Sequence, residues 1–274
     1  MNRSWFVLVF GSLLLLTFAT LVQAQDDDAV LKPAEPDFTL AALPTALNVP
    51  TGKSAFRVTH RFTRPLNCDS CPNSLAGDAF GIDNGAQIGL EYRIGVVKNG
   101  QIGVHRTSDK TLNVFGQYAL TRQTGSVPVE TSVHLGVDMT NVGRKGADTE
   151  YSPIVGVVVG RLVGERAALY IEPMFVHHSN VFTLPGDDNT FMVGLGARVR
   201  VRPTVYLTGE FVPRASGYTP GVNQGSIAIE KRAGGHMFQL NFSNAVGTTL
   251  GQVARGGADG NNWHLGFNIS RKFF

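Results

Sequence analysis

Hydrophobic and polar residues alternate along most of the chain after residue 54. Phe238, Leu240 and Phe242, for example, are each separated by one polar residue. Because successive side chains of a strand point to opposite faces, this period of two predicts strands with one apolar and one polar face. We expect about twelve of them, at 55–63, 86–96, 101–107, 111–121, 130–140, 153–162, 167–176, 190–202, 204–213, 225–232, 236–246 and 262–273. The pattern is weakest in the third segment, which is short, and in the tenth.

The segment 153–162 departs from this alternation because it is apolar on both faces. Ile154 and Val158 stand beside Val155, Val157 and Val159. An inward face without polar groups needs an apolar neighbour inside the protein. We therefore expect this strand to pack against a plug or a partner.

Most connections between the predicted strands alternate in length; the exceptions are 107–110, which is short for an outer loop, and 122–128, which is longer than a tight turn. Short ones lie at 98–100, 164–166, 202–203 and 233–235, and long ones at 64–85, 141–152, 177–189, 214–224 and 247–261. Tight turns at one rim and long loops at the other are typical of outer-membrane barrels, in which the short rim faces the periplasm. The pattern predicts an all-β fold: a single antiparallel up-and-down transmembrane β-barrel.

A secreted β-sandwich or lipocalin-like barrel would also alternate, with its apolar face turned to a shared core. Periodicity alone does not separate the two. Segment lengths near ~10 residues suit a tilted membrane strand. Aromatic residues near strand ends, such as Phe62, Tyr92 and Trp263, suit interfacial girdles. These observations, with the loop lengths, favour the membrane barrel.

The N-terminus has the features of a secretory signal. Arg3 precedes an apolar run, and Val22-Gln23-Ala24 provides the small residues that signal peptidase recognises. An uncleaved anchor is the alternative. We expect a signal peptide at 1–24 cleaved after Ala24, an acidic, proline-containing periplasmic leader at 25–54 that is mobile and solvated, and a transmembrane β-barrel at 55–274. The expected location is the outer membrane of a Gram-negative bacterium.

The last predicted strand ends on an aromatic residue, as barrel strands recognised by the barrel-assembly machinery commonly do. Its apolar residues, however, are in phase with Phe273 and not with the terminal Phe274. The assembly signal is therefore displaced by one residue.

Several segments resemble a family of bacterial outer-membrane β-barrels of unknown function, the domain of unknown function 5777 type. They include Gly234-Gly235-His236-Met237-Phe238, Gly194-Leu195-Gly196-Ala197 and Leu265-Gly266-Phe267-Asn268-Ile269. The resemblance covers roughly residues 55–274. It implies an outer-membrane barrel and no reaction.

Charged and polar residues at the inward positions of the predicted strands are the candidates for a pore lining. They are Arg57, Arg61, Glu91, Arg93, His134, Asp138, Arg198, Arg200, Glu210 and His264. They form either a structural polar core, in which opposite charges pair, or a solute path biased towards anions by its arginines.

Two loops carry further candidate chemistry. Cys68 and Cys71 suit a local disulfide in an oxidising compartment, with free or redox-active thiols as alternatives. His177, His178, Asp187 and Asp188 could bind a metal ion. With Ser179 and Asn180 the same loop could form a hydrolase-like set, and an ordinary polar loop is the third interpretation.

Composition narrows the partners without naming a substrate. The net charge of +3 indicates no nucleic-acid partner. We expect contact with outer-membrane lipid and with a small solute, and no cofactor; oligomeric state is left open. Three functions remain: a small channel or solute transporter, a structural or binding barrel that holds a periplasmic or surface partner, and an outer-membrane hydrolase. The first is favoured, and we expect no enzyme.

Overall fold

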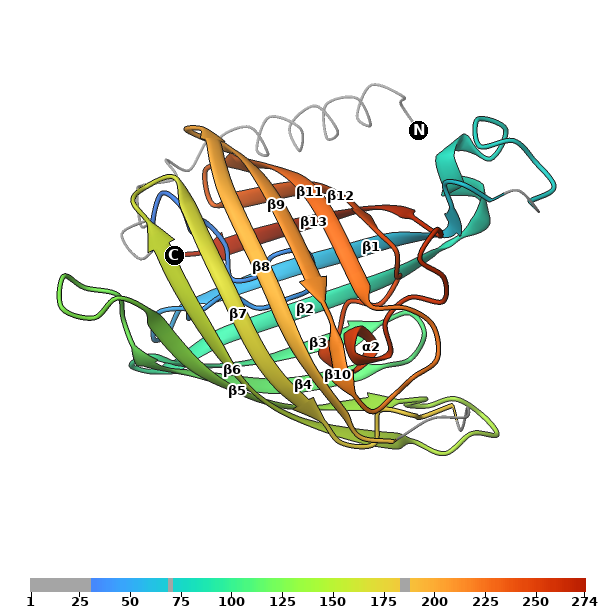
Figure 1. Ribbon diagram of the computed structural model, residues 1–274, viewed down its shortest axis with the longest axis horizontal. Coiled ribbons are helices and arrows are strands. Elements are labelled where there is room, and N and C mark those ends of the chain that lie inside the picture. The colour runs from blue at the N-terminus through green and yellow to red at the C-terminus, as the bar shows by residue number, and fades with distance from the viewer. Residues whose placement is uncertain (1–30, 69–70, 183–187) are drawn as a thin grey trace, which may run out of the picture.

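The computed structural model describes residues 31–68, 71–182 and 188–274 and shows a closed antiparallel β-barrel (Figure 1). The signal peptide and its cleavage site lie outside the described residues. The strands are β1 (Ser54–Pro65), β2 (Ala86–Val97), β3 (Gly100–Thr107), β4 (Leu112–Thr121), β5 (Glu130–Thr140), β6 (Glu150–Val163), β7 (Ala167–Val176), β8 (Thr190–Arg202), β9 (Val205–Val212), β10 (Arg214–Ser216), β11 (Gln224–Ala233), β12 (His236–Ser243) and β13 (His264–Phe273). A short 3-10 helix, η2 (Ala79–Asn84), and an α-helix, α2 (Leu250–Arg255), lie in loops.

The barrel has twelve wall strands. β10 continues β9 beyond Pro213, and both segments pair with β8. Each remaining strand pairs with its neighbours in the chain, and β1 pairs with β13 to close the ring. The predicted fold class is therefore confirmed, including its two weakest segments, which are β3 and β11.

The two rims differ as the connection lengths predict. Figure 1 shows most of the tight turns and the C-terminus at one end and most of the long loops at the other. The exceptions are the long β4–β5 connection at 122–129, at the first end, and the short β3–β4 connection at 108–111, at the second. By the rule for outer-membrane barrels, the end with tight turns faces the periplasm.

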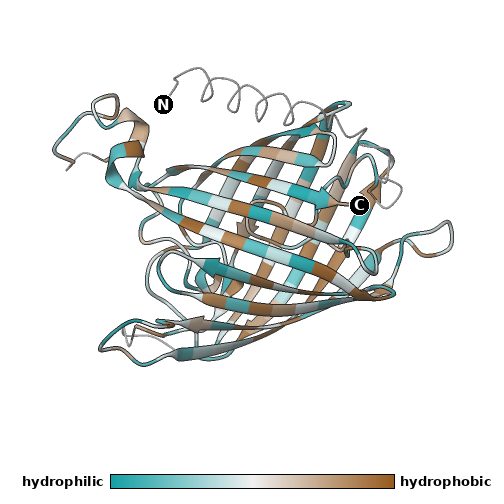
Figure 2. Cartoon of the chain, turned by 180° about the vertical axis from the view of Figure 1, so that it is seen from behind, coloured by the Kyte–Doolittle hydropathy of each residue, from teal (hydrophilic) through white to brown (hydrophobic). Residues whose placement is uncertain are grey.

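The wall is apolar outside and polar inside. Leu90, Leu135 and Leu207, on three different strands, each expose about half of their surface. Their polar strand neighbours Glu91, His134 and Thr208 are buried, and Figure 2 shows the alternating bands around the wall. A soluble sandwich would have the opposite arrangement, so the membrane barrel is the correct interpretation. No helix in the described part of the chain is long and apolar enough to cross a membrane.

Our prediction for the proline-containing segment before β1 is wrong. We expected 25–54 to be a solvated periplasmic leader, but residues 34–49 are buried. Leu40 and Leu43 pack with inward-facing residues of β6, β7 and β8. Its apolar residues lack a regular period, so the local sequence resembles a spacer. The wall residues that it packs against are distant in sequence, so no local pattern indicates its burial. We call residues 31–49 the plug.

A second segment enters the barrel from the opposite end. The β12–β13 loop forms α2, whose six residues are all buried. Thr249 caps this helix in a capping box with Gln252. The Asp138 carboxylate, on β5, accepts hydrogen bonds from the Thr249 hydroxyl and, at 3.0 Å, from the Gly251 N–H. The barrel interior is thus filled from both ends.

Candidate pore and its plug

The plug is a re-entrant hairpin with both ends at the periplasmic rim. Thr45 N–H donates to Phe38 O at 2.9 Å and Leu40 N–H donates to Leu43 O at 2.8 Å, which closes a turn around Ala41 and Ala42. Lys32, near its start, pairs with Glu130 at the first position of β5. Its later part returns to the same rim and continues into β1. We call residues 40–43 the plug tip.

The plug tip is held through its main chain by opposite charges. Ala41 O accepts hydrogen bonds from Arg57 Nη2 at 2.5 Å, Arg61 Nη2 at 3.3 Å and Asn268 Nδ2 at 3.0 Å. The N–H groups of residues 41–43 all donate to Glu210 Oε2, at 3.0–3.1 Å. Hydrogen bonds to ionised groups are about twice as strong as neutral ones. The lumen side chains therefore bind the backbone of this turn.

The rest of the plug is anchored by two more buried ion pairs. Arg198 Nε lies 2.7 Å from Glu230 Oε2, and Arg198 Nη2 also donates to Thr39 O at 2.6 Å. Asp37 accepts a hydrogen bond from Ser270 Oγ at 2.6 Å and pairs with Lys272 at 3.3 Å. A buried charge without a partner is costly, so plug and wall complete one another electrostatically.

Glycines in β8 make room for the leucines of the plug tip. A Cβ at Gly196 would lie 2.3 Å from Leu40 Cδ1, and one at Gly194 would lie 2.9 Å from Leu43 Cδ1. Real Cβ atoms do not approach other atoms so closely, and the leucines are themselves enclosed. Apolar Ile154 and Val158 of β6 belong to the same cluster. The two-sided apolarity of the predicted segment 153–162 is thereby explained by packing against a plug.

The C-terminal residue contacts the plug. Phe274 packs against the cluster formed by Leu31, Phe38, Leu47, Val49 and Ala55, with its ring 6.4 Å from that of Phe38 in an edge-to-face arrangement. Phe273 points outward with the apolar set of β13. The two terminal aromatics therefore serve different faces, which accounts for the displaced phase in the sequence.

All but one of the predicted lining residues are buried inside the barrel. Arg57 and Arg93 flank Glu91, with Arg57 Nη1 at 3.4 Å from its carboxylate, because Arg57 and Glu91 are cross-strand partners. The other buried members of the set are Arg61, His134, Asp138, Arg198, Glu210 and His264. His134 stacks on Phe115 with centroids 5.4 Å apart.

Arg200 is the predicted lining residue that is not buried inside the barrel. It lies at the periplasmic rim, partly exposed, where it pairs with Glu165 at 3.7 Å and donates to Pro203 O. The strand phase is right, but the position is the last inward one before a turn, so the side chain reaches solvent. Four of the five arginines in the predicted set thus have carboxylate partners, and Arg61 is the exception within the described residues.

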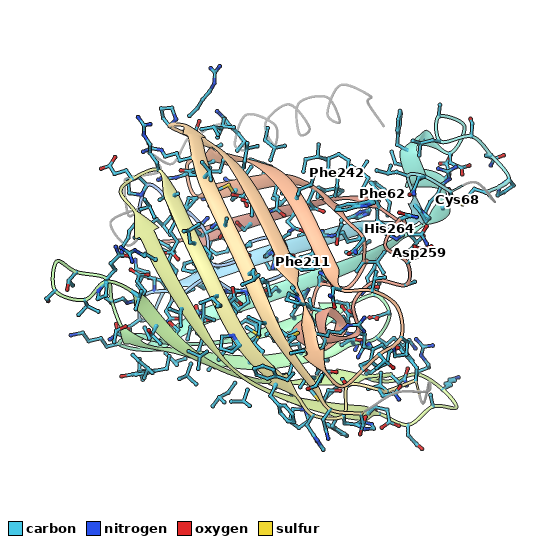
Figure 3. All side chains as sticks on the ribbon, viewed as in Figure 1. Phe62, Cys68, Phe211, Phe242, Asp259 and His264 are labelled. Carbon is cyan, nitrogen blue, oxygen red and sulfur yellow. A yellow bond between two sulfur atoms is a disulfide. The ribbon has the colours of Figure 1, made fainter. Side chains whose placement is uncertain are left out.

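Little space is left between the plug and α2. A cavity of about 30 Å³ between them is lined by Thr39, Glu91, Arg93, His134, Thr248 and Leu250, and a volume of that size holds about one water. A larger vestibule of about 700 Å³ opens at the outer end, lined by residues such as Gln87, Asp109, Tyr218, Arg255 and His264. Figure 3 shows His264 near this end.

The loop candidates lie at the outer end, away from the plug. Cys68 and Cys71 form a disulfide (Figure 3). His178 Nδ1 lies 2.8 Å from Asp188 Oδ2, and Nε2 lies 3.1 Å from Glu150 Oε2. The hydrogen bond with Asp188 raises the pKa of His178, and an imidazole held by two carboxylates has no free nitrogen for a metal ion.

Among the described residues of this loop, His177 and Ser179 make their side-chain hydrogen bonds to residues other than His178. His177 Nδ1 contacts Asn189 Oδ1 at 2.6 Å, and Asp187 lies outside the described residues. Ser179 is fully buried, and its hydroxyl contacts Asp188 O and Thr190 Oγ1. Among the described residues, no group of three His, Cys, Asp or Glu is arranged to hold a metal ion.

Sequence reasoning did not place the plug at residues 31–49, and it missed Lys272 of β13, which pairs with Asp37. A usable signal exists in hindsight. Leu40, Leu43 and Leu47 recur between Pro36 and Pro50, which is too apolar for a solvated spacer.

Comparison with known proteins agrees with this architecture. The family model for a membrane-bound β-barrel domain, DUF5777, matches residues 37–273. The chain belongs to this family. The match begins within the plug at Asp37, so the family domain includes most of the plug as well as the wall. No curated protein matches the chain.

Several solved outer-membrane proteins have similar structures. An outer-membrane channel from Pseudomonas putida F1 shares 10% identity at a TM-score of 0.50, over 82% of this chain and 97% of its own. The NanC porin shares 7% identity at 0.49, over 81% and 100%. Outer membrane phospholipase A from Escherichia coli shares 10% at 0.46, over 80% and 89%. At such identities the likeness concerns the fold alone. The chain is an outer-membrane β-barrel protein.

Proposed function

We propose that the protein is an outer-membrane channel for small solutes that the plug holds closed. The observation that carries the proposal is the binding mode of the plug tip. Its backbone is held by Arg57, Arg61, Asn268 and Glu210, which are polar groups that water or a solute can bind when the tip leaves. A lumen sealed for structural reasons alone has no need of ionised groups, since apolar packing of similar volume is at least as stabilising.

The charges of the proposed pore are balanced locally. Arg57 pairs with Glu91 and Arg198 pairs with Glu230. We therefore propose an arginine-bearing lumen without one dominant sign, rather than a path with a general preference for anions. Selectivity would then depend on how positive and negative groups are placed around the plug tip.

The test compares an opened and a relocked plug in planar bilayers. Gly196→Leu places a side chain where Leu40 lies, so we expect frequent conductance steps from a folded barrel in which wild type is rarely open. Ala46→Cys with Gly160→Cys provides the lock, because a Cβ at Gly160 would lie 3.2 Å from Ala46 Cβ. Disulfide-linked Cβ atoms are roughly 3.5–4.5 Å apart, so a small adjustment suffices.

In the triple variant, oxidation should silence the conductance of Gly196→Leu and a reductant should restore it. Gly196→Leu alone, treated with the same reductant, controls for opening of the native Cys68–Cys71 disulfide. A Gly196→Leu barrel whose plug is cleaved by added protease but which never conducts would contradict the channel.

We propose no catalytic role. Ser179 is buried without a histidine partner among its hydrogen bonds, whereas a nucleophilic serine needs an adjacent base. Alanine at His177, His178 and Ser179 should leave lipase and esterase assays at the level of the unaltered barrel. A lost signal would favour the hydrolase.

A further inference from the structure

The plug tip lies between a basic and an acidic side of the lumen. Arg57 and Arg61 come from β1 and Asn268 comes from the adjacent β13, whereas Glu172 comes from β7 and Glu210 from β9. β7 lies halfway around the twelve-strand ring from β1. The carbonyl of Ala41 faces the basic side and the N–H groups of residues 41–43 face Glu210, so the turn is oriented by this charge separation.

Both sides keep polar atoms that the plug tip leaves without a partner. Glu172 is fully buried, and neither of its carboxylate oxygens has a hydrogen-bond partner among the described residues. On the basic side, Arg61 is buried and its Nε lacks a partner in the same part of the structure. Buried polar atoms are nearly always satisfied, so a ligand with more donors and acceptors than a peptide turn would complete both sides.

From this geometry we propose that the plug tip occupies a binding site for short zwitterionic peptides. The proposal rests on the proposed channel, whose substrate class it names. A peptide carboxylate would replace the Ala41 carbonyl and bind the two guanidinium groups with two oxygens instead of one. A peptide ammonium would replace the three N–H groups at Glu210 and could also donate a hydrogen bond to Glu172. Residues 41–43 of the plug tip have the sequence Ala-Ala-Leu. The plug tip would therefore act as a tethered competitor of the free peptide.

The same groups explain which solutes the site disfavours. An anion without an amine would satisfy Arg57 and Arg61 but would leave the Glu210 carboxylate and the unpartnered oxygens of Glu172 without a donor. A cation without a carboxylate would meet the two arginines. Leu40 and Leu43 pack on Gly196 and Gly194, so an apolar side chain beside the charged ends would fill the space that a leaving leucine vacates.

The experiment measures competition between a free peptide and the plug in the full-length protein. The probe is the tripeptide Ala-Ala-Leu, and the matched controls are its N-acetylated, C-amidated and doubly capped forms. Hydrogen exchange at the amides of residues 41–43 reports plug release. Saturating zwitterionic peptide should raise the fraction of molecules with a released plug about tenfold, and exchange at these amides should accelerate by the same factor. Exchange in β5 and β6 should not change. The three capped forms should have little effect.

Two variants keep the outcome decisive. Glu210→Gln should lose the discrimination between Ala-Ala-Leu and its acetylated form, and Gly196→Leu, with a loosened plug, should bind radiolabelled Ala-Ala-Leu directly in equilibrium dialysis. Suppose that Gly196→Leu conducts and the disulfide lock closes it, but free and capped peptides act alike or no peptide binds. The peptide site is then refuted and the channel stands. If neither lock nor loosening changes conductance, the channel itself fails.

Discussion

Replacing Glu210 by glutamine tests how strongly charge holds the plug. Glu210 Oε2 accepts the N–H groups of residues 41–43 at 3.0–3.1 Å, and Oε1 accepts Ser226 Oγ at 3.1 Å. The amide keeps the size and one acceptor oxygen but removes the charge. A hydrogen bond to a charged group contributes about 1 kcal/mol more than a neutral one. Three weakened bonds therefore lower the stability of the closed plug by about 3 kcal/mol.

This loss corresponds to about a hundredfold larger open fraction, since each 1.4 kcal/mol is a factor of ten. Native-state hydrogen exchange at residues 41–43 measures the shift, and open probability in bilayers should rise in parallel.

The matched control is Ser226→Ala, which removes a partner of Glu210 and keeps its charge. It should change exchange at the plug tip by much less. Unchanged protection of residues 41–43 in Glu210→Gln, or an equal loss of protection in β5 and β6, would refute the reasoning. In the second case the charge would stabilise the whole barrel and not the plug.

Three further predictions concern the two ends of the barrel. Asp138→Ala removes the carboxylate that binds the start of α2, so the β12–β13 loop should lose about 1–3 kcal/mol of stability. This loop should become sensitive to external protease, while the barrel keeps its heat-modifiable gel mobility. Phe274→Ala removes the ring that packs on Phe38; we expect a loss of about 1–2 kcal/mol for a half-buried aromatic, seen as faster exchange near the plug entrance but not at the outer loops. The pKa of His178 is raised in the folded loop. Its contacts therefore stabilise the loop fully below the ordinary imidazole pKa near 6.5 and weaken as the pH rises through the raised value. Hydrogen exchange in the loop should follow this pH profile, and the profile should become flat in His178→Gln.

The alternating pattern determined the wall of this protein. Inward and outward sets, strand bounds and rim asymmetry follow from a period of two and from connection lengths, which are local properties. For this reason even the weak segments that became β3 and β11 were recognisable. The two-sided apolarity of β6 likewise predicted that something must fill the barrel beside it.

Tertiary structure alone decided what fills the barrel. The plug has no period, and its receptors Arg57, Glu210 and Arg198 are separated from it in sequence by as much as 169 residues. The pairing of Arg57 with Glu91 depends on the register of two strands. The position of Arg200 at a rim depends on where β8 ends. Such facts are set by which groups meet across the lumen, where a buried charge must find a partner, and no local pattern encodes that choice.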